Sequence, residues 1–175
     1  VNLLRGLSAR PEKVIILSSQ SATGPCGPGQ LCKTEGDTDT PLTWYGKSKL
    51  EMEQRLAKEF SDWNYLCLRP PMILGARDQA TLPLFKMVRN RVHFKPGFKA
   101  KQYSYVAVSD LVEAILSALD ADWSALKQRY FFVASEEPVT DEQLISQAAI
   151  ASSTKGYLLR IPQPILKGVS RVVDN

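Results

Sequence analysis

Residues 40–49 read Thr-Pro-Leu-Thr-Trp-Tyr-Gly-Lys-Ser-Lys, and they predict the first turns of a helix. We place Thr40 as the N-cap of this helix, because Pro41 suits the first helical position, where no backbone N–H is needed. Positions four apart lie on one face of a helix. Tyr45 and Lys49 are therefore expected to point the same way.

A tyrosine beside a lysine has a chemical use. A phenol keeps its proton until about pH 10, and a nearby ammonium favours the phenolate and lowers the pKa. Such a phenol passes a proton to or from a substrate oxygen near neutral pH. The spacing alone is equally that of an ordinary helix with an exposed lysine, so the hypothesis depends on the surrounding sequence.

Two short apolar runs flank this helix. Residues 14–17, Val-Ile-Ile-Leu, and residues 65–68, Tyr-Leu-Cys-Leu, are typical of strands buried in a parallel sheet. Strand, helix and strand in this order predict a βαβ unit and an α/β fold. Ser18 and Ser19 follow the first run, at the carboxyl end of the strand, where open α/β sheets bind ligands.

The other predicted elements are shorter. Ser109 is expected to cap the helix that follows it, and Thr140 with Gln143 has the form of a capping box. Residues 25–39 form a loop that is long for a simple connection. Helices are predicted at 2–9, 79–90, 110–120, 140–151 and after 162, and strands at 92–94, 103–106, 130–133 and 157–161. Residues 69–75 are expected to be a rigid extended loop.

The composition is that of a globular protein: the chain has 175 residues, of which 44% are hydrophobic and 23% charged. No apolar run is long enough to span a bilayer, so we expect no membrane partner. No charged and then apolar leader is recognisable, which favours a cytoplasmic location. The first residue is Val1, at the start of an uncapped helical pattern, so we expect a piece of a longer protein.

The charge is unevenly distributed. The net charge is +4, and residues 86–101 hold six lysines and arginines, His93 and no acid. Such a run is either a solvated face or a site for an anion such as a phosphate, a carboxylate or the tail of coenzyme A. Nucleic acid is not an expected partner, because the run lacks interleaved aromatic residues on a known nucleic-acid module.

Three cysteines give no even disulfide framework. Cys26 and Cys32 flank a segment rich in Gly and Pro and could approach each other in the loop, but free thiols are expected in a cytoplasmic protein. We expect no metal site, because zinc needs more ligands than this loop offers.

Four segments follow one another in a recognisable order: the strand ending in Ser18-Ser19, the Tyr45-x-x-x-Lys49 pair, Arg-Pro-Pro-Met-Ile-Leu-Gly at 69–75, and Tyr-Ser-Tyr-Val-Ala-Val-Ser-Asp-Leu at 103–111. In this order they resemble the extended short-chain dehydrogenase/reductase family, also called the NAD-dependent epimerase/dehydratase family. The sequence is most similar to the branch of dihydroflavonol-reductase-like and steroid-dehydrogenase-like oxidoreductases. The resemblance covers about residues 2–165.

The fold that the resemblance implies is the C-terminal part of a Rossmann-type parallel sheet with a small mixed α+β substrate-binding region. Residues 1–71 would form the second half of the Rossmann-like domain and carry the catalytic residues. Residues 72–175 would form the substrate-binding region, with 105–134 returning to the sheet. A homodimer through the Tyr45 helix is expected by analogy.

The activity that the resemblance implies is that of an NAD(P)-dependent oxidoreductase or epimerase/dehydratase with a small carbonyl or alcohol substrate. Tyr45 would be the general acid/base, Lys49 would lower its pKa and bind the nicotinamide ribose, and Ser19 would polarise the substrate oxygen. The cofactor, NAD or NADP, would contact Ser18, Tyr45, Lys49, Pro70, Pro71 and Met72. The substrate would contact Ser19, Ser21, Arg77 and Tyr103.

Some positions depart from the family pattern. The glycine-rich dinucleotide fingerprint is not found, so the fragment as isolated is expected to bind cofactor poorly and to be inactive. Tyr103 stands where sugar-nucleotide enzymes of this family carry an arginine for the diphosphate, and a phenol supplies no charged fork. We therefore expect an apolar or aromatic substrate against residues such as Phe85, Met87 and Phe94, which could equally be ordinary core.

Two further alternatives stay open at this point. The chain could be a non-catalytic member of the family that senses the cofactor or binds a partner, or it could be a fragment without activity. The presence of Ser19, Tyr45 and Lys49 together favours the enzyme.

Overall fold

A computed structural model describes residues 1–154 and 157–162, and the chain divides into two compact units. Unit 1 comprises Val1–Ile73 and Tyr105–Ser135. Unit 2 comprises Leu74–Ser104 and the described part of residues 136–175. The helix predicted after residue 162 lies outside the described residues. Within those ranges, no helix has the length and apolar character needed to cross a membrane.

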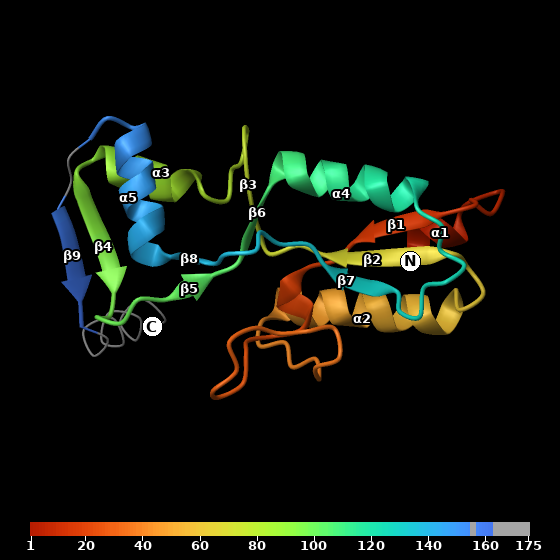
Figure 1. Cartoon of the computed structure of the whole chain (residues 1–175). Helices are drawn as coiled ribbons and strands as arrows, with labels where there is room; N and C mark the ends of the chain where they lie inside the picture. The colour runs from red at the N-terminus through yellow and green to blue at the C-terminus, as the bar shows by residue number, and fades with distance from the viewer. Residues whose placement is uncertain (155–156, 163–175) are drawn as a thin grey trace. The chain divides into compact units, whose positions relative to one another are not determined.

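Unit 1 is built on a three-stranded parallel sheet with the order β1-β2-β7 (Figure 1). The strands are β1 (Val14–Leu17), β2 (Tyr65–Arg69) and β7 (Tyr130–Phe132). The register pairs Val14 with Tyr65 and Cys67 with Tyr130. All residues of β2 are buried, as expected for a central strand. The predicted α/β class and the parallel βαβ unit are therefore confirmed.

Helices lie on both faces of this sheet, α2 (Trp44–Glu59) on one and α4 (Val108–Asp120) on the other (Figure 1). On the α2 side, Leu56 and Phe60 pack against Tyr65 and Cys67 of β2 in one buried cluster. This core fixes which face of α2 meets the sheet. A short helix, α1 (Asn2–Arg5), replaces the longer helix predicted over residues 2–9.

Two predicted helix caps are wrong. The N-cap of α2 is Thr43, whose hydroxyl accepts a hydrogen bond from Gly46 N at 3.0 Å, and not Thr40. Thr40 instead closes the long loop, since its N–H donates to Thr23 O at 2.9 Å. In α4 the N-cap is Ala107, without a side-chain bond, and not Ser109. Strand β6 (Tyr105–Ala107) runs directly into this helix, which leaves no turn for a polar cap.

The segment after the two prolines is a strand and not the predicted loop. Met72–Leu74 forms β3, which pairs with β6. The extended backbone that Pro70 and Pro71 impose continues directly into it. The single strand predicted over residues 103–106 is likewise split, because β5 (Gln102–Tyr103) pairs with β8 (Val139–Thr140) and β6 with β3.

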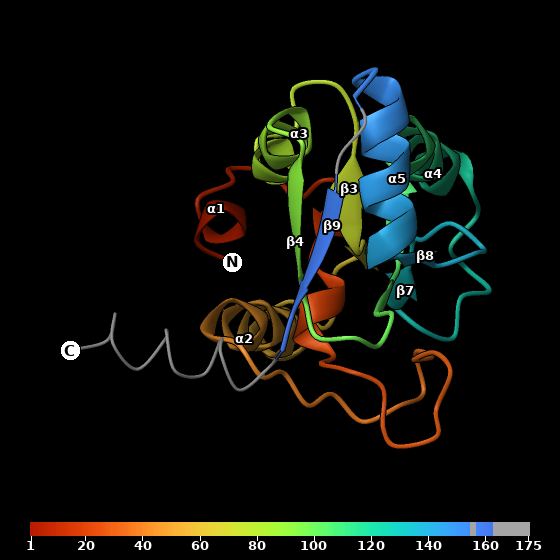
Figure 2. The same ribbon diagram turned by 90° about the vertical axis from the view of Figure 1, so that its left-hand side faces the viewer.

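Unit 2 is a small mixed α+β unit. It contains α3 (Leu82–Arg89), α5 (Asp141–Ala151) and the parallel strands β4 (Val92–Pro96) and β9 (Tyr157–Ile161), which lie side by side in Figure 2. Val88 of α3 packs with Ile145 and Ala148 of α5. The predicted capping box of α5 is confirmed, with Thr140 as N-cap and Gln143 at its third position.

Part of the basic run is neutralised inside unit 2. The side chain of Lys95 is fully buried, and its Nζ lies 2.6 Å from Glu142 Oε1 and 3.3 Å from Asp141 Oδ1. Glu142 also pairs with Arg160 at 3.1 Å. These acids come from the first turn of α5, which is distant in sequence. Lys95 is therefore part of an internal ion cluster and not of a solvated basic face.

Candidate active site

The predicted serines lie at the carboxyl end of β1. Ser18 N donates to Leu68 O of the neighbouring strand at 2.8 Å, and its hydroxyl is enclosed without a partner among the described residues. Ser19 is the N-cap of the 3-10 helix η1 (Gln20–Ala22), and its Oγ accepts from Ser21 N at 3.2 Å. The Ser19 side chain is thus held at the carboxyl edge of the sheet, where open α/β sheets in general bind ligands.

Tyr45 and Lys49 lie on the first two turns of α2. Lys49 Nζ donates to Leu17 O, the last carbonyl of β1, at 3.1 Å. The same ammonium lies 5.8 Å from the centre of the Tyr45 ring. Tyr45 is 56% exposed. The lysine therefore ties the start of α2 to the strand end that carries the two serines, while the phenol stays open to a ligand.

A glycine lets α2 approach these serines closely. A Cβ on Gly46 would lie 2.2 Å from Ser21 O, far closer than any side chain permits. Gly46 follows Tyr45 directly, so this contact sets the distance between the tyrosine and the serine turn. Sequence reasoning gave Gly46 no role.

The proline segment is joined to the same turn. Pro70 O accepts a hydrogen bond from Gln20 N at 2.9 Å, so the end of β2 is held next to η1. Pro70 is buried, and Pro71 and Met72 are partly exposed. Ser18, Ser19, Pro70 and the Tyr45 helix are thus brought together within unit 1.

A buried ion cluster beneath the site was not predicted. Arg69, at the end of β2, binds Glu53 of α2 through two bonds, Nε to Oε1 at 3.0 Å and Nη2 to Oε2 at 2.6 Å. Its Nη2 also donates to Asp39 Oδ2 at 2.9 Å. The guanidinium carbon lies 5.0 Å from the centre of the Tyr130 ring. Arg69 and Glu53 are 4% and 1% exposed, so each charge depends on the other.

The electrostatics of this cluster follow from its burial. Burial alone lowers the pKa of Arg69, but the hydrogen bond and charge of Glu53 and the charge of Asp39 outweigh it and raise that pKa. Burial, helped by the charge of Glu53, raises the pKa of the neighbouring Cys67 thiol to about 12. The sequence does contain a signal for this cluster: Arg69 follows directly after an apolar strand, and a cation in such a place needs a buried acidic partner.

The two remaining predicted residues belong to unit 2. Arg77 is an exposed residue between β3 and α3 with a positive φ of 68°. Tyr103 lies in β5 and is 42% exposed. Their contact with a substrate stays a prediction.

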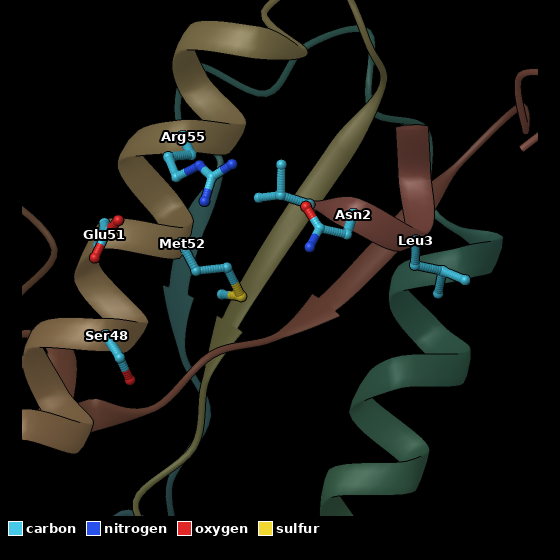
Figure 3. Close-up of a pocket in the computed structure, with 7 residues that line it drawn as sticks. Asn2, Leu3, Ser48, Glu51, Met52 and Arg55 are labelled. Atoms are coloured by element: carbon cyan, nitrogen blue, oxygen red, sulfur yellow. The ribbon is translucent and has the colours of Figure 1, made fainter. Parts of the chain in front are cut away.

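A pocket of about 430 Å³ lies elsewhere in unit 1, between α1 and α2 (Figure 3). Asn2 and Leu3 line it from α1, and Ser48, Met52 and Arg55 are among the residues of α2 that face it. None of the candidate catalytic side chains lines this pocket. It is therefore distinct from the site at the end of β1.

The site is that of an α/β protein with a serine turn and a Tyr-x-x-x-Lys helix at the carboxyl end of a parallel strand. The sequence profile of the NAD dependent epimerase/dehydratase family matches residues 1–134. The chain belongs to this family. No curated protein matches the chain.

Solved structures show the same fold at low sequence identity. A candidate epimerase of Burkholderia cenocepacia is 22% identical with a TM-score of 0.73, and the match covers 93% of this chain and 53% of that chain. RMD of Pseudomonas aeruginosa, complexed with NADPH, is 18% identical with a TM-score of 0.70, covering 90% and 54%. UDP-glucose 4-epimerase of Thermus thermophilus, complexed with NAD, is 19% identical with a TM-score of 0.65, covering 86% and 51%. The chain thus spans about half the length of these structures.

Proposed function

We propose that this chain is the catalytic part of an NAD(P)-dependent oxidoreductase or epimerase/dehydratase that acts on a small carbonyl or alcohol. The observation that carries the proposal is the bond from Lys49 Nζ to Leu17 O at 3.1 Å. It holds the Tyr45 helix against the strand end that carries Ser19. A phenol, an ammonium and a hydroxyl at one edge of a parallel sheet are the groups that carbonyl reduction and alcohol oxidation need.

The described residues fit the nicotinamide end of NAD or NADP. The Lys49 ammonium has three donors, and Leu17 O takes only one of them, which leaves capacity for ribose hydroxyls. Pro71 and Met72 offer a partly exposed apolar surface beside the serine turn. For the pyrophosphate, no described helix begins after a glycine-rich turn, so we assign no residue of these ranges to it.

When bound, a nicotinamide would supply or accept the hydride in the proposed reaction. In the reduction direction, Tyr45 would give its phenolic proton to the carbonyl oxygen, and in the oxidation direction it would take the proton back. Ser19 donates a hydrogen bond to the same oxygen. Lys49 stabilises the negative charge that Tyr45 carries once its proton has left.

For the substrate we propose an apolar or aromatic carbonyl or alcohol. Tyr103 provides an exposed phenol where a diphosphate would need a charged fork. Phe85 of α3 is 39% exposed in the same unit. The internal pairing of Lys95 also removes one cation from those available to a phosphate. An acidic tail on the substrate would have the remaining exposed lysines of the run as partners.

The test uses the intact protein with NAD or NADP and two substrate panels, nucleotide sugars and apolar ketones or alcohols. We expect turnover on the apolar panel, and we expect Tyr45→Phe to lower it by a factor of about 100 or more while cofactor affinity is kept. Trp44→Phe, at the exposed neighbouring position, is the control and should leave turnover unchanged.

Near-normal turnover in Tyr45→Phe would contradict the proton-transfer role. Turnover of nucleotide sugars alone would contradict the proposed substrate class. Cofactor binding without turnover on either panel would favour the non-catalytic alternative.

A further inference from the structure

The loop between η1 and α2 connects the turn of Ser19 with the helix of Tyr45, and it is anchored along its base. Lys33 Nζ donates to Thr23 O and to Thr38 O, both at 2.7 Å. Glu35 accepts from Phe132 N on the edge strand β7 at 3.0 Å, and Asp39 binds Arg69. A loop held at this many points presents its tip in a defined conformation.

The tip of the loop is a tight turn. Gln30 N donates to Gly27 O at 3.1 Å, and Gly29 has a φ of +77°, the positive value that a type II turn requires at its third residue. The Gln30 side chain strengthens the turn, because its Oε1 accepts from Gly27 N at 2.9 Å and its Nε2 donates to Asp37 at 2.7 Å. The turn therefore reverses the chain between residues 26 and 31.

This reversal brings the Cys26 side chain close to the peptide group that precedes Cys32. Cys26 Sγ lies 3.9 Å from Leu31 O, the carbonyl of the peptide group that leads into Cys32. Covalent geometry separates a carbonyl oxygen from the next Cα by about 3 Å. The sulfur of Cys26 is thus within about 7 Å of the Cα of Cys32. Closing a disulfide, in which the two Cα atoms lie about 4.4–6.8 Å apart, requires rotation of both side chains and a shift of the backbone of this loop, where both cysteines are exposed.

The accessibility of the three cysteines differs sharply. Cys26 and Cys32 are exposed free thiols on the loop, whereas Cys67 is completely buried in β2. Burial raises the pKa of Cys67 to about 12, which keeps it protonated and unreactive. Thiol chemistry on the folded chain is therefore confined to the two residues of the loop.

We propose that Cys26 and Cys32 are a reversible dithiol–disulfide pair. A low-molecular-weight disulfide such as oxidised glutathione is the oxidant. One protein thiolate attacks it, forms a mixed disulfide and releases one glutathione thiol, and the other protein thiolate displaces the second. The net change is one protein disulfide formed and one glutathione disulfide reduced to two thiols. The product cross-links the turn in the segment that joins Ser19 to Tyr45.

The proposal concerns the folded loop and does not depend on the activity proposed above. It predicts that folding raises the effective concentration of one thiol towards the other, because the turn is already formed. To measure this effective concentration, the protein is equilibrated with fixed ratios of oxidised to reduced glutathione, once in buffer and once in denaturing urea. We expect the equilibrium constant for the disulfide to be at least about tenfold larger in the folded protein.

Mass spectrometry identifies the product, since a single tryptic peptide, residues 14–33, holds both cysteines. The wild type should lose two hydrogens in this peptide, while Cys26→Ser and Cys32→Ser should each keep a glutathione adduct. Gly29→Ala strains the turn, so it should lower the equilibrium constant for the disulfide. Gly36→Ala, at an open position of the same loop, is the control and should leave this constant unchanged.

Two results would overturn the proposal. One is an equal or larger constant in urea than in buffer. The other is a folded wild type that accumulates two glutathione adducts, or a disulfide between two molecules, in place of the internal one.

Discussion

The substitution Glu53→Gln tests the ion cluster that joins α2 to β2. It keeps the size of the side chain and removes its charge, while Arg69 stays 4% exposed beside it. Removing one partner of a buried ion pair costs about 3–5 kcal/mol. Asp39 remains 2.9 Å from the guanidinium, and a glutamine oxygen still accepts one bond. We therefore expect a loss at or just below the lower limit of this range, about 2–3 kcal/mol in the free energy of unfolding.

Urea unfolding followed by tryptophan fluorescence measures this loss. The three tryptophans, Trp44, Trp63 and Trp123, all belong to unit 1, so the signal reports the unit that contains the cluster. Asp39→Asn should cost less, because the Asp39 carboxylate is 24% exposed and that of Glu53 only 2%. The double variant should cost more than the sum of the two, since it leaves Arg69 buried without any counter-charge. A loss below about 1 kcal/mol for Glu53→Gln would refute the view that this cluster stabilises unit 1.

Two further predictions concern one unit each. Gly46→Ala should destabilise unit 1 by about 1–3 kcal/mol in the same fluorescence assay, because its Cβ would lie 2.2 Å from Ser21 O, and a loss no larger than that of Gly36→Ala would contradict this. In unit 2, the hydrogen bond from Lys95 and, second, that from Arg160 lower the pKa of Glu142 below its ordinary 4.5. The stability that this carboxylate adds is therefore complete above pH 4.5, and it is lost as the pH falls through the lower pKa that Glu142 has in the folded protein. Amide hydrogen exchange in α5 should show this acid loss in the wild type, and the loss should be reduced in Glu142→Gln.

The parallel sheet of unit 1 could be predicted because its signals are local. Residues 14–17 and 65–68 are apolar runs of strand length, and the Tyr45 helix between them has a helical period. The capping box could be predicted from the sequence for the same reason, since its two partners, Thr140 and Gln143, lie within one helical turn. Each of these elements is specified by neighbours in sequence.

The errors arise where distant parts of the chain decide the structure. Thr40 has the residue type of an N-cap, but its backbone is used to close the loop against Thr23, and Thr43 caps α2 instead. Met72–Leu74 becomes a strand because β6, far along the chain, offers a partner. The partners of Arg69 and Lys95 lie on other elements. No period or motif connects such residues.

The register of α2 shows how the fold supports the proposed chemistry. Tyr45, Lys49 and Glu53 are spaced four apart, so they form one stripe along the helix. Lys49 binds the end of β1 at Leu17 O, and Glu53 binds the end of β2 at Arg69. These two contacts to neighbouring strands fix the rotation of α2 about its axis and its position along that axis relative to the sheet. The phenol at the top of the stripe therefore takes its place from the two charged residues below it. The helix that carries Tyr45 is thus held by the ends of β1 and β2, and by the close approach of Gly46 to Ser21, and we propose that these contacts place the phenol beside Ser19.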